Sequence, residues 1–450
     1  MLRRSVRWWV VAGSAVVGLF ALVMGVLQLR ARQALAQPDI ILISIDTLRP
    51  DHLGCYGYDR PTSPNIDRFR RDAVLFRTTI AAAPSTLPSH ASLFTSLAPQ
   101  HHGASHTGRI PLAPSLVTIA EVLRDSGYET AAIVGGGQLA PEWGLTQGFE
   151  TYEMAWDETF EQIAGRAADR IARRTRRPLF LFLHTYQIHH PYMPDVLDLE
   201  RVHRAAGSEL PFAIEPARLA EMNEGLIPYS AQDRDHVVAL YDGEIAGMDR
   251  GMGDLVAELK RLGMYDRALI LFTSDHGEEF GEHGFLGWHS HTLFEELLRV
   301  PLLMKLPDGR RAGTEIGGVM RSLDIAPMIL EAAGLPAHPQ FRQFTLAGAL
   351  ARGQTRAVPA LLWMEPSPGT THSRDGIRTD RWKLSEDRLY DLVGDPQETR
   401  DVAREVPEVA RRLAAERTSM RNARRAPGKG PAITPSQETI DSLRALGYVQ

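Results

Sequence analysis

APSTLPSHASLFTSL, residues 83–97, joins a first half rich in proline and hydroxyl side chains to a small and apolar second half. Residues 84–90 are typical of a constrained turn, because proline fixes its own φ angle and removes a backbone donor. Residues 91–97 predict a buried helix. A hydroxyl on a rigid turn at a helix N-terminus lies where backbone N–H groups attract an anion, such as a phosphate or sulfate ester. The alternative is a proline-rich surface loop that leads into a core helix.

Two further segments, residues 40–45 and 268–273, have the pattern of strands buried on both faces of a parallel sheet. Asp46 directly follows the first, and Asp275 and His276 come shortly after the second. Ligand groups in open α/β sheets collect at the carboxyl ends of strands, and carboxylate and imidazole groups are ligands for divalent cations. The alternative is that an aspartate after a strand is a plain turn or cap residue.

Composition limits the classes of protein that fit this chain. At 450 residues with 44% hydrophobic content, it can bury a large core, and its length favours one big domain with a smaller one. A net charge of −5 without a sustained basic stripe argues against a nucleic-acid partner. Cys55 is the sole cysteine, which excludes an intramolecular disulfide and a cysteine-based zinc site.

The N-terminal residues predict a membrane segment. An uncharged run at residues 8–29 follows three arginines, and about twenty apolar residues at ~1.5 Å each span a bilayer core. A signal peptide usually has a shorter apolar core of ~7 to 15 residues, although Ala34-Leu35-Ala36 has the pattern of a cleavage site. Residues 1–37 are therefore expected to be a membrane anchor or, alternatively, a cleaved signal. Either way the catalytic part is expected to be periplasmic or extracellular.

The order of residues from Thr86 to Ser96, TLPSHASLFTS, resembles the signature C-x-P-S-R-x-x-L-x-T-G of the sulfatase family, in the alkaline phosphatase superfamily. Three positions differ: Thr86 replaces the nucleophilic Cys or Ser, His90 replaces arginine, and Ser96 replaces glycine. Family sulfatases oxidise their Cys or Ser to formylglycine, whereas a threonine would give a ketone. The resemblance therefore implies that Thr86 acts unmodified, as in the superfamily's phosphodiesterases and phosphotransferases.

Two other segments carry the same resemblance. The run that begins at Asp46-Thr47 is similar to the first metal motif of the family, and Asp275-His276 matches the second. The resemblance implies one divalent metal ion (Ca, Mn or Zn) held by Asp46, Thr86, Asp275 and His276, and no organic cofactor. It also implies an α/β fold, an alkaline phosphatase-like three-layer sandwich. This fold has a large, mostly parallel central sheet and a small C-terminal antiparallel-sheet subdomain.

The resemblance also assigns roles to histidines. His189 matches the active-site histidine of the family pattern H-x-x-D-P-H-x-P-Y and is expected to protonate the leaving oxygen. Arylsulfatases bind the sulfate with a lysine of a G-K-W-H motif, but this chain has GGGQ at residues 135–138 and no lysine before Lys260. His90 or His289 is expected to hold the anion, because a protonated histidine is a positive donor near neutral pH.

The chain divides into four expected segments after these assignments. The N-terminal residues 1–37 precede a sulfatase-like catalytic domain at residues 38–345 and a subdomain at residues 346–425. Residues 426–450 are a linker and a tail that could dock as a short helix. Within the catalytic domain, residues 197–235 are expected to be an insertion that shapes substrate choice. Other expected elements are helices at residues 116–125 and 241–262, and strands at residues 130–134 and 178–183.

These features together predict an exported, metal-dependent hydrolase that cleaves esters through a covalent threonyl intermediate at Thr86. The unmodified threonine favours a phosphate mono- or diester, or a phosphonate ester, as the small anionic substrate. The first alternative is a sulfuric ester hydrolase. The second is an inactive membrane-anchored binding protein. The sequence does not predict the leaving group or the oligomeric state.

Overall fold

The computed structural model describes residues 37–448 apart from residues 203–212, 342–343, 345, 356–358, 367–372 and 424–430. The predicted membrane anchor or signal at residues 1–37 lies, except for its last residue, outside the described residues and stays a prediction. Among the helices that are described, none is both long enough and apolar enough to cross a bilayer.

The centre of the molecule is a nine-stranded sheet in the order β11-β2-β10-β6-β1-β5-β3-β4, with β9 paired to β2. The five strands from β6 to β4 are parallel to one another, whereas β10 is antiparallel to both of its neighbours. The expected large and mostly parallel sheet is confirmed. Its strands are β1 Ile40–Ile45, β2 Val74–Ile80, β3 Glu129–Val134, β4 Thr151–Met154, β5 Leu179–Thr185, β6 Leu269–Ser274, β9 Arg299–Val300, β10 Leu302–Lys305 and β11 Glu315–Arg321.

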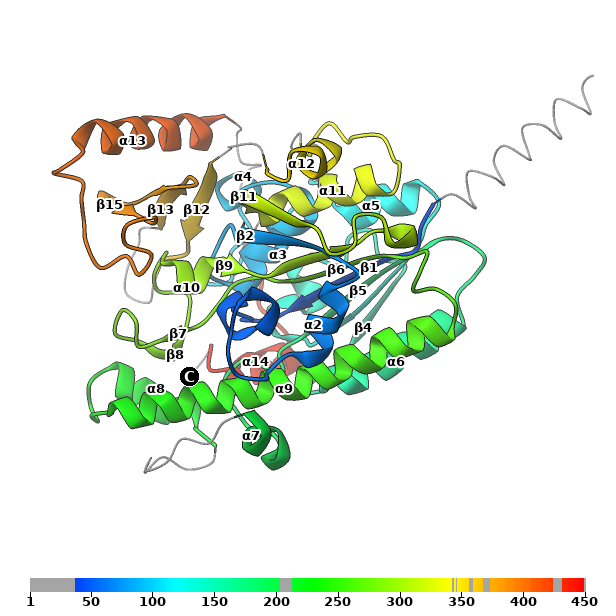
Figure 1. Cartoon of the computed structure of the whole chain (residues 1–450), viewed down its shortest axis with the longest axis horizontal. Coiled ribbons are helices and arrows are strands. Elements are labelled where there is room, and N and C mark those ends of the chain that lie inside the picture. Colours follow the sequence, from blue (N-terminus) through cyan, green and yellow to red (C-terminus); the bar gives the residue numbers. More distant parts are fainter. Residues whose placement is uncertain are drawn as a thin grey trace, which may run out of the picture.

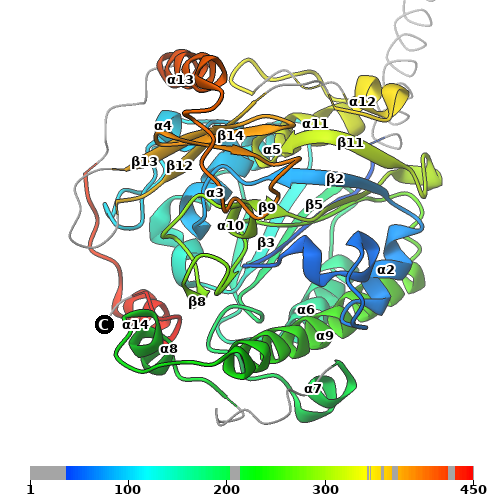
Figure 2. The same cartoon turned by 60° about the vertical axis from the view of Figure 1, so that its left-hand side comes forward.

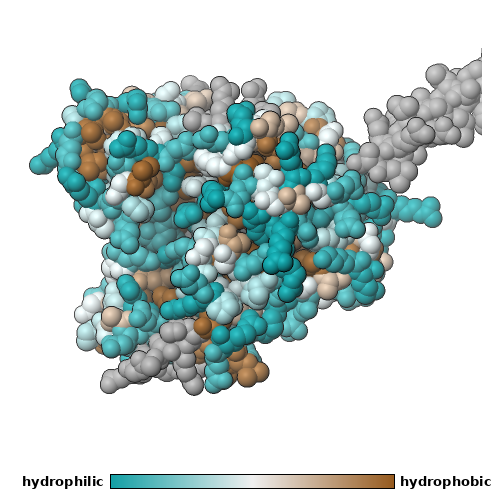
Figure 3. Space-filling model, viewed as in Figure 1, coloured by the Kyte–Doolittle hydropathy of each residue, from teal (hydrophilic) through white to brown (hydrophobic). Residues whose placement is uncertain are grey.

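Helices cover both faces of this sheet, which confirms the three-layer sandwich (Figure 1). Side chains of β1 alternate between two cores: Ile41 and Ile43 pack on the side of α2, α6 and α9, and Ile40 and Leu42 on the side of α3, α5 and α11. Figure 3 shows a mostly hydrophilic face with scattered hydrophobic patches, and the two cores of buried apolar side chains lie between the layers. These helices are α2 Pro64–Arg70, α3 Thr86–Thr95, α5 Ile119–Asp125, α6 Phe160–Ala172, α9 Ala231–Arg261 and α11 Ile325–Ala332.

Capping side chains determine where two of the helices begin. Helix α5 begins at Ile119 and not at residue 116, because Thr118 and Glu121 each accept a hydrogen bond from the backbone N–H of the other. Helix α9 begins at Ala231, earlier than expected, because Ser230 and Asp233 form the same reciprocal cap. The expected insertion at residues 197–235 therefore begins inside α7 Val196–Val202, contains α8 Pro216–Asn223 and ends inside α9.

A separate four-stranded antiparallel sheet follows in the order β12-β13-β14-β15, which confirms the expected small C-terminal sheet. Helix α13 Pro407–Asn422 covers it, and Leu413 of that helix is buried against Ile377 and Leu389. The exact domain boundaries stay predictions. The strands are β12 Ala360–Met364, β13 Arg374–Arg378, β14 Trp382–Ser385 and β15 Arg388–Asp391.

The C-terminal tail docks on the main domain as α14 Gln437–Ala445, as expected. Leu443 is buried in the core on the α3 side of the sheet, and Ile433 N donates to Arg109 O at 2.9 Å. Figure 2 shows α14 far from α13, so the tail leaves the small sheet and returns to the main domain. The remaining elements are α4 Pro99–His102, α10 Glu295–Leu298, α12 Leu346–Arg352, β7 Glu279–Phe280 and β8 Leu286–Trp288, with short 3-10 turns at Pro50–His52, Gly54–Tyr56, Gly137–Leu139, Pro141–Trp143, Pro307–Gly309 and Ser322–Asp324.

One stability prediction concerns the start of α2, which depends on a carboxylate of α9. Asp249 is buried and accepts hydrogen bonds from Asn65 N, Asn65 Nδ2 and Ile66 N. Asp249→Ala should lower the free energy of unfolding by about 1–3 kcal/mol in urea titrations, because it leaves these donors unpaired. Asp254→Ala, at an exposed position of the same helix, should change it by less than about 0.5 kcal/mol. Equal losses in the two variants would contradict this capping role.

Candidate active site

Neighbouring strands end at one edge of the sheet and bring distant residues together. Strand β1 lies between β5 and β6, and Ile45 pairs in register with Thr185 and Ser274. Asp46 follows β1, and Asp275 follows β6. Helix α3 begins at this edge with Thr86, as its contact with Asp46 shows.

The Thr86 hydroxyl lies at the centre of the predicted metal ligands. It donates to Asp46 Oδ2 at 3.1 Å and lies 3.4 Å from His276 Nε2. Asp275 Oδ1 accepts hydrogen bonds from Thr47 N at 3.3 Å and from His276 N at 2.9 Å. Ligand atoms of Asp46, Asp275 and His276 all lie within 4.8 Å of one another, and the side chains are fully buried. The structure thus brings the four predicted ligands into one cluster.

The chemistry of this cluster fits a divalent cation. Asp46 Oδ1 and Asp275 Oδ2 are buried and make no hydrogen bond within the described part of the chain. Burial, and after it the Asp275 carboxylate, raises the pKa of Asp46 well above its usual range. His276 Nδ1 lies 2.9 Å from Gly277 O and must donate to it, so the Nε2 lone pair faces Thr86. Two carboxylates and an imidazole suit Zn or Mn, and the ligand roles stay predictions.

His90 lies beneath this cluster and faces into the protein. Its Nε2 lies 3.0 Å from Ser44 Oγ, and its Nδ1 lies 2.9 Å from Thr86 O and 3.6 Å from Asp275 Oδ2. Both ring nitrogens are therefore already used by protein atoms. The expectation that His90 holds the substrate anion does not fit this geometry, and a role in positioning Thr86 does.

His189 and His289 face each other beside the nucleophile, with ring centroids 4.9 Å apart. His189 Nδ1 donates to His190 O at 2.5 Å, and His289 Nδ1 donates to Glu278 Oε1 at 2.9 Å. Burial lowers the pKa of His189 well below its usual range and that of His289 to about 4. Neutral rings correct the expectation of a protonated His289. They also leave His189 Nε2 without a proton for the leaving oxygen in the free protein.

Sequence reasoning missed Tyr448 and gave no role of its own to His184, one of three histidines that follow a buried strand within seven residues. Tyr448, beyond α14, places its hydroxyl 2.8 Å from His289 Nε2, 3.1 Å from His189 Nε2 and 3.4 Å from Thr86 Oγ1. Burial, and after it the Asp46 carboxylate, raises the pKa of Tyr448 well above its usual range, so the hydroxyl keeps its proton. His184 Nε2 lies 3.5 Å from Asp46 Oδ2. A signal existed for His184, which stands at the end of a buried strand, but none for Tyr448.

Two buried lysines, Lys305 and Lys383, bind protein groups and are not available to hold an anion. Lys305 donates to Ala268 O at 3.2 Å, and Lys383 pairs with Glu398 at 2.5 Å. Leu87 N, near the start of α3, donates to Gln138 Oε1 at 2.9 Å. The expectation that the helix N-terminus binds the anion is therefore wrong for this amide, because the glutamine of the GGGQ segment already occupies it.

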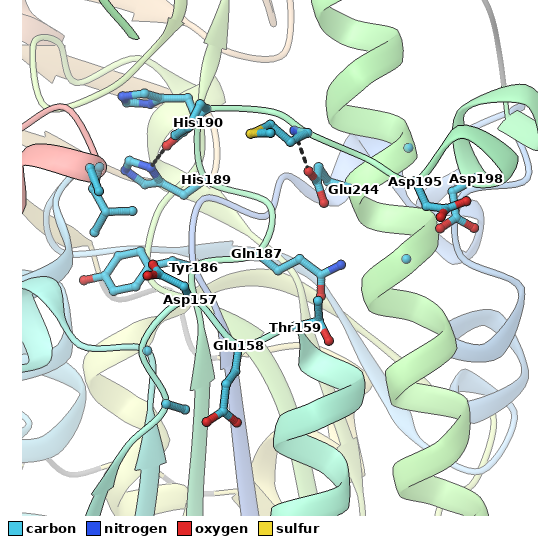
Figure 4. Close-up of a pocket in the computed structure, with 18 of the residues that line it drawn as sticks. Asp157, Glu158, Thr159, Tyr186, Gln187, His189, His190, Asp195, Asp198 and Glu244 are labelled. Atoms are coloured by element: carbon cyan, nitrogen blue, oxygen red, sulfur yellow. Dashed lines mark hydrogen bonds between the residues drawn. The ribbon is translucent and has the colours of Figure 1, made fainter. Parts of the chain in front are cut away.

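A cavity of about 580 Å³ lies next to the His189 side chain (Figure 4). Its lining includes His189 and His190 but not Thr86, so it adjoins the reacting group without enclosing it. One arginine, Arg250, lines the cavity and pairs with Asp198. Most of the charge at the wall is therefore negative. The lining carboxylates are Asp157, Glu158, Asp195, Asp198 and Glu244.

A prediction about the cation follows from the unpaired carboxylates. Asp46→Asn should raise the melting temperature of the metal-free protein, because it removes a carboxyl group whose charge is disfavoured by burial and, after it, by Asp275. The wild type should gain about 2.7 kcal/mol of stability at a cation concentration one hundred times Kd, and Asp46→Asn should gain far less. Differential scanning fluorimetry with Mn²⁺, Zn²⁺ and Ca²⁺ measures both effects. Asp266→Asn, an exposed control, should respond as the wild type does. A wild type unaffected by all three cations would contradict the assignment.

Comparison with known proteins agrees with this geometry. The family model described as Sulfatase matches residues 38–335, and the model described as N-sulphoglucosamine sulphohydrolase, C-terminal, matches residues 281–423. A multifunctional alkaline phosphatase superfamily protein of Trinickia caryophylli is 25% identical over 386 residues, which cover 67% of this chain and 74% of that protein. A choline-sulfatase of Rhizobium meliloti (strain 1021) is 24% identical over 447 residues, which cover 82% of each chain.

Solved structures show the same fold. A phosphonate monoester hydrolase of Agrobacterium radiobacter superposes with a TM-score of 0.69 at 22% identity, over 86% of this chain and 96% of that one. This likeness concerns the fold alone. The sulfatase family model, however, covers the strands of the main sheet together with Asp46, Thr86, Asp275 and His276. The chain therefore belongs to the sulfatase family and is a hydrolase that acts on ester bonds.

Proposed function

We propose that the chain hydrolyses phosphate or phosphonate esters with a divalent cation and with Thr86 as an unmodified nucleophile. The observation that carries this proposal is the Thr86 hydroxyl, which donates to Asp46 at 3.1 Å within a cluster of two buried carboxylates and an imidazole. A secondary alcohol in this position acts as a nucleophile directly when a base or a cation lowers its pKa. The fold neighbour that is a phosphonate monoester hydrolase is consistent with such a substrate.

The chemistry at Thr86 follows from its hydrogen bond. When Oγ1 forms its bond to phosphorus, its proton passes to Asp46 Oδ2, the atom to which it already donates. A divalent cation held by Asp46, Asp275 and His276 would lower the pKa of the hydroxyl and offset charge on the ester oxygens. As the new bond forms, the bond to the leaving oxygen breaks. Water then cleaves the threonyl ester and regenerates the free hydroxyl.

The leaving oxygen lies on the side of the phosphorus opposite Thr86 and takes up a proton there. His189 lies at the edge of the cavity, where a leaving group has room. Because its Nε2 is unprotonated in the free protein, the ring must first take up a proton from the solvent in the cavity before it can protonate the leaving oxygen. A good leaving group, such as a nitrophenolate, would need no such proton.

A sulfuric ester hydrolase is the second candidate. The match to the sulfatase family model and the choline-sulfatase relative favour it. The threonine opposes it, because oxidation of a threonine gives a ketone and not the aldehyde that family sulfatases use. An inactive binding protein is the third candidate, which a complete set of cation ligands disfavours.

The charge of the cavity wall supports a proposal about the leaving group. Of its five carboxylates, Asp198 pairs with Arg250 and Glu158 pairs with Arg166. Burial raises the pKa of Glu244, which accepts a hydrogen bond from Met193 N at 2.7 Å (Figure 4), to about 7. Asp157 and Asp195 therefore give the wall most of its negative charge. Carboxylates in a partly closed cavity attract cations and repel anions. We therefore propose that the alcohol released by hydrolysis is neutral or cationic and not anionic.

The nucleophile is tested by substitution of Thr86. Thr86→Ala should lower kcat/KM for the best ester by about a thousandfold or more, because no covalent ester can form. Thr86→Ser keeps a hydroxyl and should retain activity within about tenfold. Ser85→Ala, which removes the preceding hydroxyl, serves as the matched control and should stay close to the wild type. Activity of Thr86→Ala within tenfold of the wild type would contradict the proposal.

The same assay decides between the candidate functions. Aryl phosphate, phosphodiester, phosphonate and sulfate esters are compared with the full chain, with and without Mn²⁺, Zn²⁺ or Ca²⁺. Metal-dependent turnover of a phosphate or phosphonate ester is the expected result. Turnover of sulfate esters alone would favour the second candidate. No turnover of any ester and no bound metal would favour the third.

The charge of the leaving group gives a further prediction. An ester of a quaternary ammonium alcohol should have a higher kcat/KM than an ester whose alcohol carries a carboxylate. Asp157→Asn should lower the ratio of these two kcat/KM values by about fivefold, or ~1 kcal/mol, because it removes one negative charge from the cavity wall. Asp169→Asn, at an exposed position of α6 outside the lining, should leave the ratio unchanged. A ratio that favours the carboxylate-bearing ester would refute this preference.

A further inference from the structure

The last described residues of the chain form part of the active site. Helix α14 is held by Leu443 in the core, by Ser436 N, which donates to Glu142 Oε1 at 3.0 Å, and by contacts with the turn Gly137–Leu139. This turn belongs to the GGGQ segment, where arylsulfatases carry a binding lysine. The tail therefore packs against the segment that lacks the usual positive group, and Tyr448 follows α14 directly into the site.

Tyr448 reaches the nucleophile with its hydroxyl and packs with its ring. Its oxygen lies 3.4 Å from Thr86 Oγ1, the atom expected to attack the ester. Its ring centroid lies 5.4 Å from that of His189, and 5.5 Å from those of His289 and His106. Contacts on several sides restrict the ring, so the position of the hydroxyl is set by packing as well as by its own hydrogen bonds.

The imidazoles around this hydroxyl present lone pairs to it. His189 Nδ1 donates to a carbonyl and His289 Nδ1 to a carboxylate, so both Nε2 atoms are acceptors when the rings are neutral. His276 is held in the same way, by Gly277 O. His276 Nε2 is the expected cation ligand, so the lone pairs of His189 and His289 remain beside the ester. An anionic ester oxygen placed between these two lone pairs would meet no hydrogen from the neutral rings. The Tyr448 O–H supplies one.

We propose that Tyr448 is a catalytic residue whose hydroxyl donates a hydrogen bond to an anionic oxygen of the ester group while Thr86 attacks. It takes the part that the binding lysine has in the arylsulfatases. This inference rests on the proposed function, since it requires ester chemistry at Thr86. In the free protein the hydroxyl donates to an imidazole Nε2, and it turns to the ester oxygen when substrate binds.

The step balances without any change at the phenol. The bond between Thr86 Oγ1 and phosphorus forms, the bond between phosphorus and the leaving oxygen breaks, and the threonine proton passes to Asp46. The leaving oxygen takes a proton from the cavity. Tyr448 keeps its own proton throughout and stabilises negative charge that grows on an oxygen that stays on phosphorus. Such a hydrogen bond acts on the transition state more than on the bound substrate.

Tyr448→Phe tests the hydroxyl alone, because the ring and its packing remain. With the best phosphate or phosphonate ester, kcat should fall about a hundredfold while KM changes little. The loss should be equal for a nitrophenyl and a phenyl ester, since the hydrogen bond goes to an oxygen that does not leave. Tyr265→Phe, which removes a hydroxyl bonded to Asp72 far from the site, should match the wild type.

Turnover by the wild type tests the proposed function separately from the role of Tyr448, and a second variant, Tyr448→Ala, tests whether the ring acts by packing. If the wild type turns over no ester, the proposed function fails whatever Tyr448 does. If the wild type is active and Tyr448→Phe stays within threefold of it, the inference is overturned. Tyr448→Ala should lose little more kcat than Tyr448→Phe. A large loss in the alanine variant alone, a loss confined to KM, or a greater loss with the phenyl ester would show a packing or leaving-group role and overturn the inference. Thermal melting verifies that each variant is folded.

Discussion

Two carboxylates, Asp46 and Asp275, lie fully buried at the ends of adjacent parallel strands, and each has an oxygen without a hydrogen bond in the described part of the chain. Like charges at this distance in a dry interior are stable only with a proton or a cation between them. The register of β1 with β6 brings them together, and α3 adds the hydroxyl of Thr86. The site therefore exists because the sheet forces two negative groups into contact and leaves their charge for a cation to neutralise.

The described side chains around this cluster offer little positive charge to an anionic ester. His90 takes the position where an arginine is expected, and His289 lies where a lysine is expected. Burial lowers the pKa of His289 to about 4, and His90 is used by Ser44 and the Thr86 carbonyl. Neutral rings with fixed Nδ1 donors are good cation ligands and poor anion ligands. A cation and the Tyr448 hydroxyl then remain to stabilise the ester.

Much of the fold and the metal cluster could be predicted because their signals are local. Continuous apolar runs identified β1, β5 and β6. A polar residue that directly follows a strand of a parallel sheet lies at the carboxyl edge of that sheet, where ligands bind. Ionisation of His189 could not be predicted, because it depends on burial. Tyr448 could not be predicted either, because it lies 362 residues from Thr86 in the sequence and reaches it through the docking of α14. The start of α9 was missed because its cap, Ser230, lies inside the segment of residues 197–235 that was expected to be an insertion.

The account depends most directly on where a cation binds. An anomalous difference map from crystals of the protein soaked in Mn²⁺ tests this without any assumption about substrate. It should show one strong peak within about 2.0–2.6 Å of carboxylate oxygens of Asp46 and Asp275, with Thr86 Oγ1 in the coordination shell. A peak bound elsewhere, or a cluster that stays free of metal when Mn²⁺ is in excess, would contradict the account.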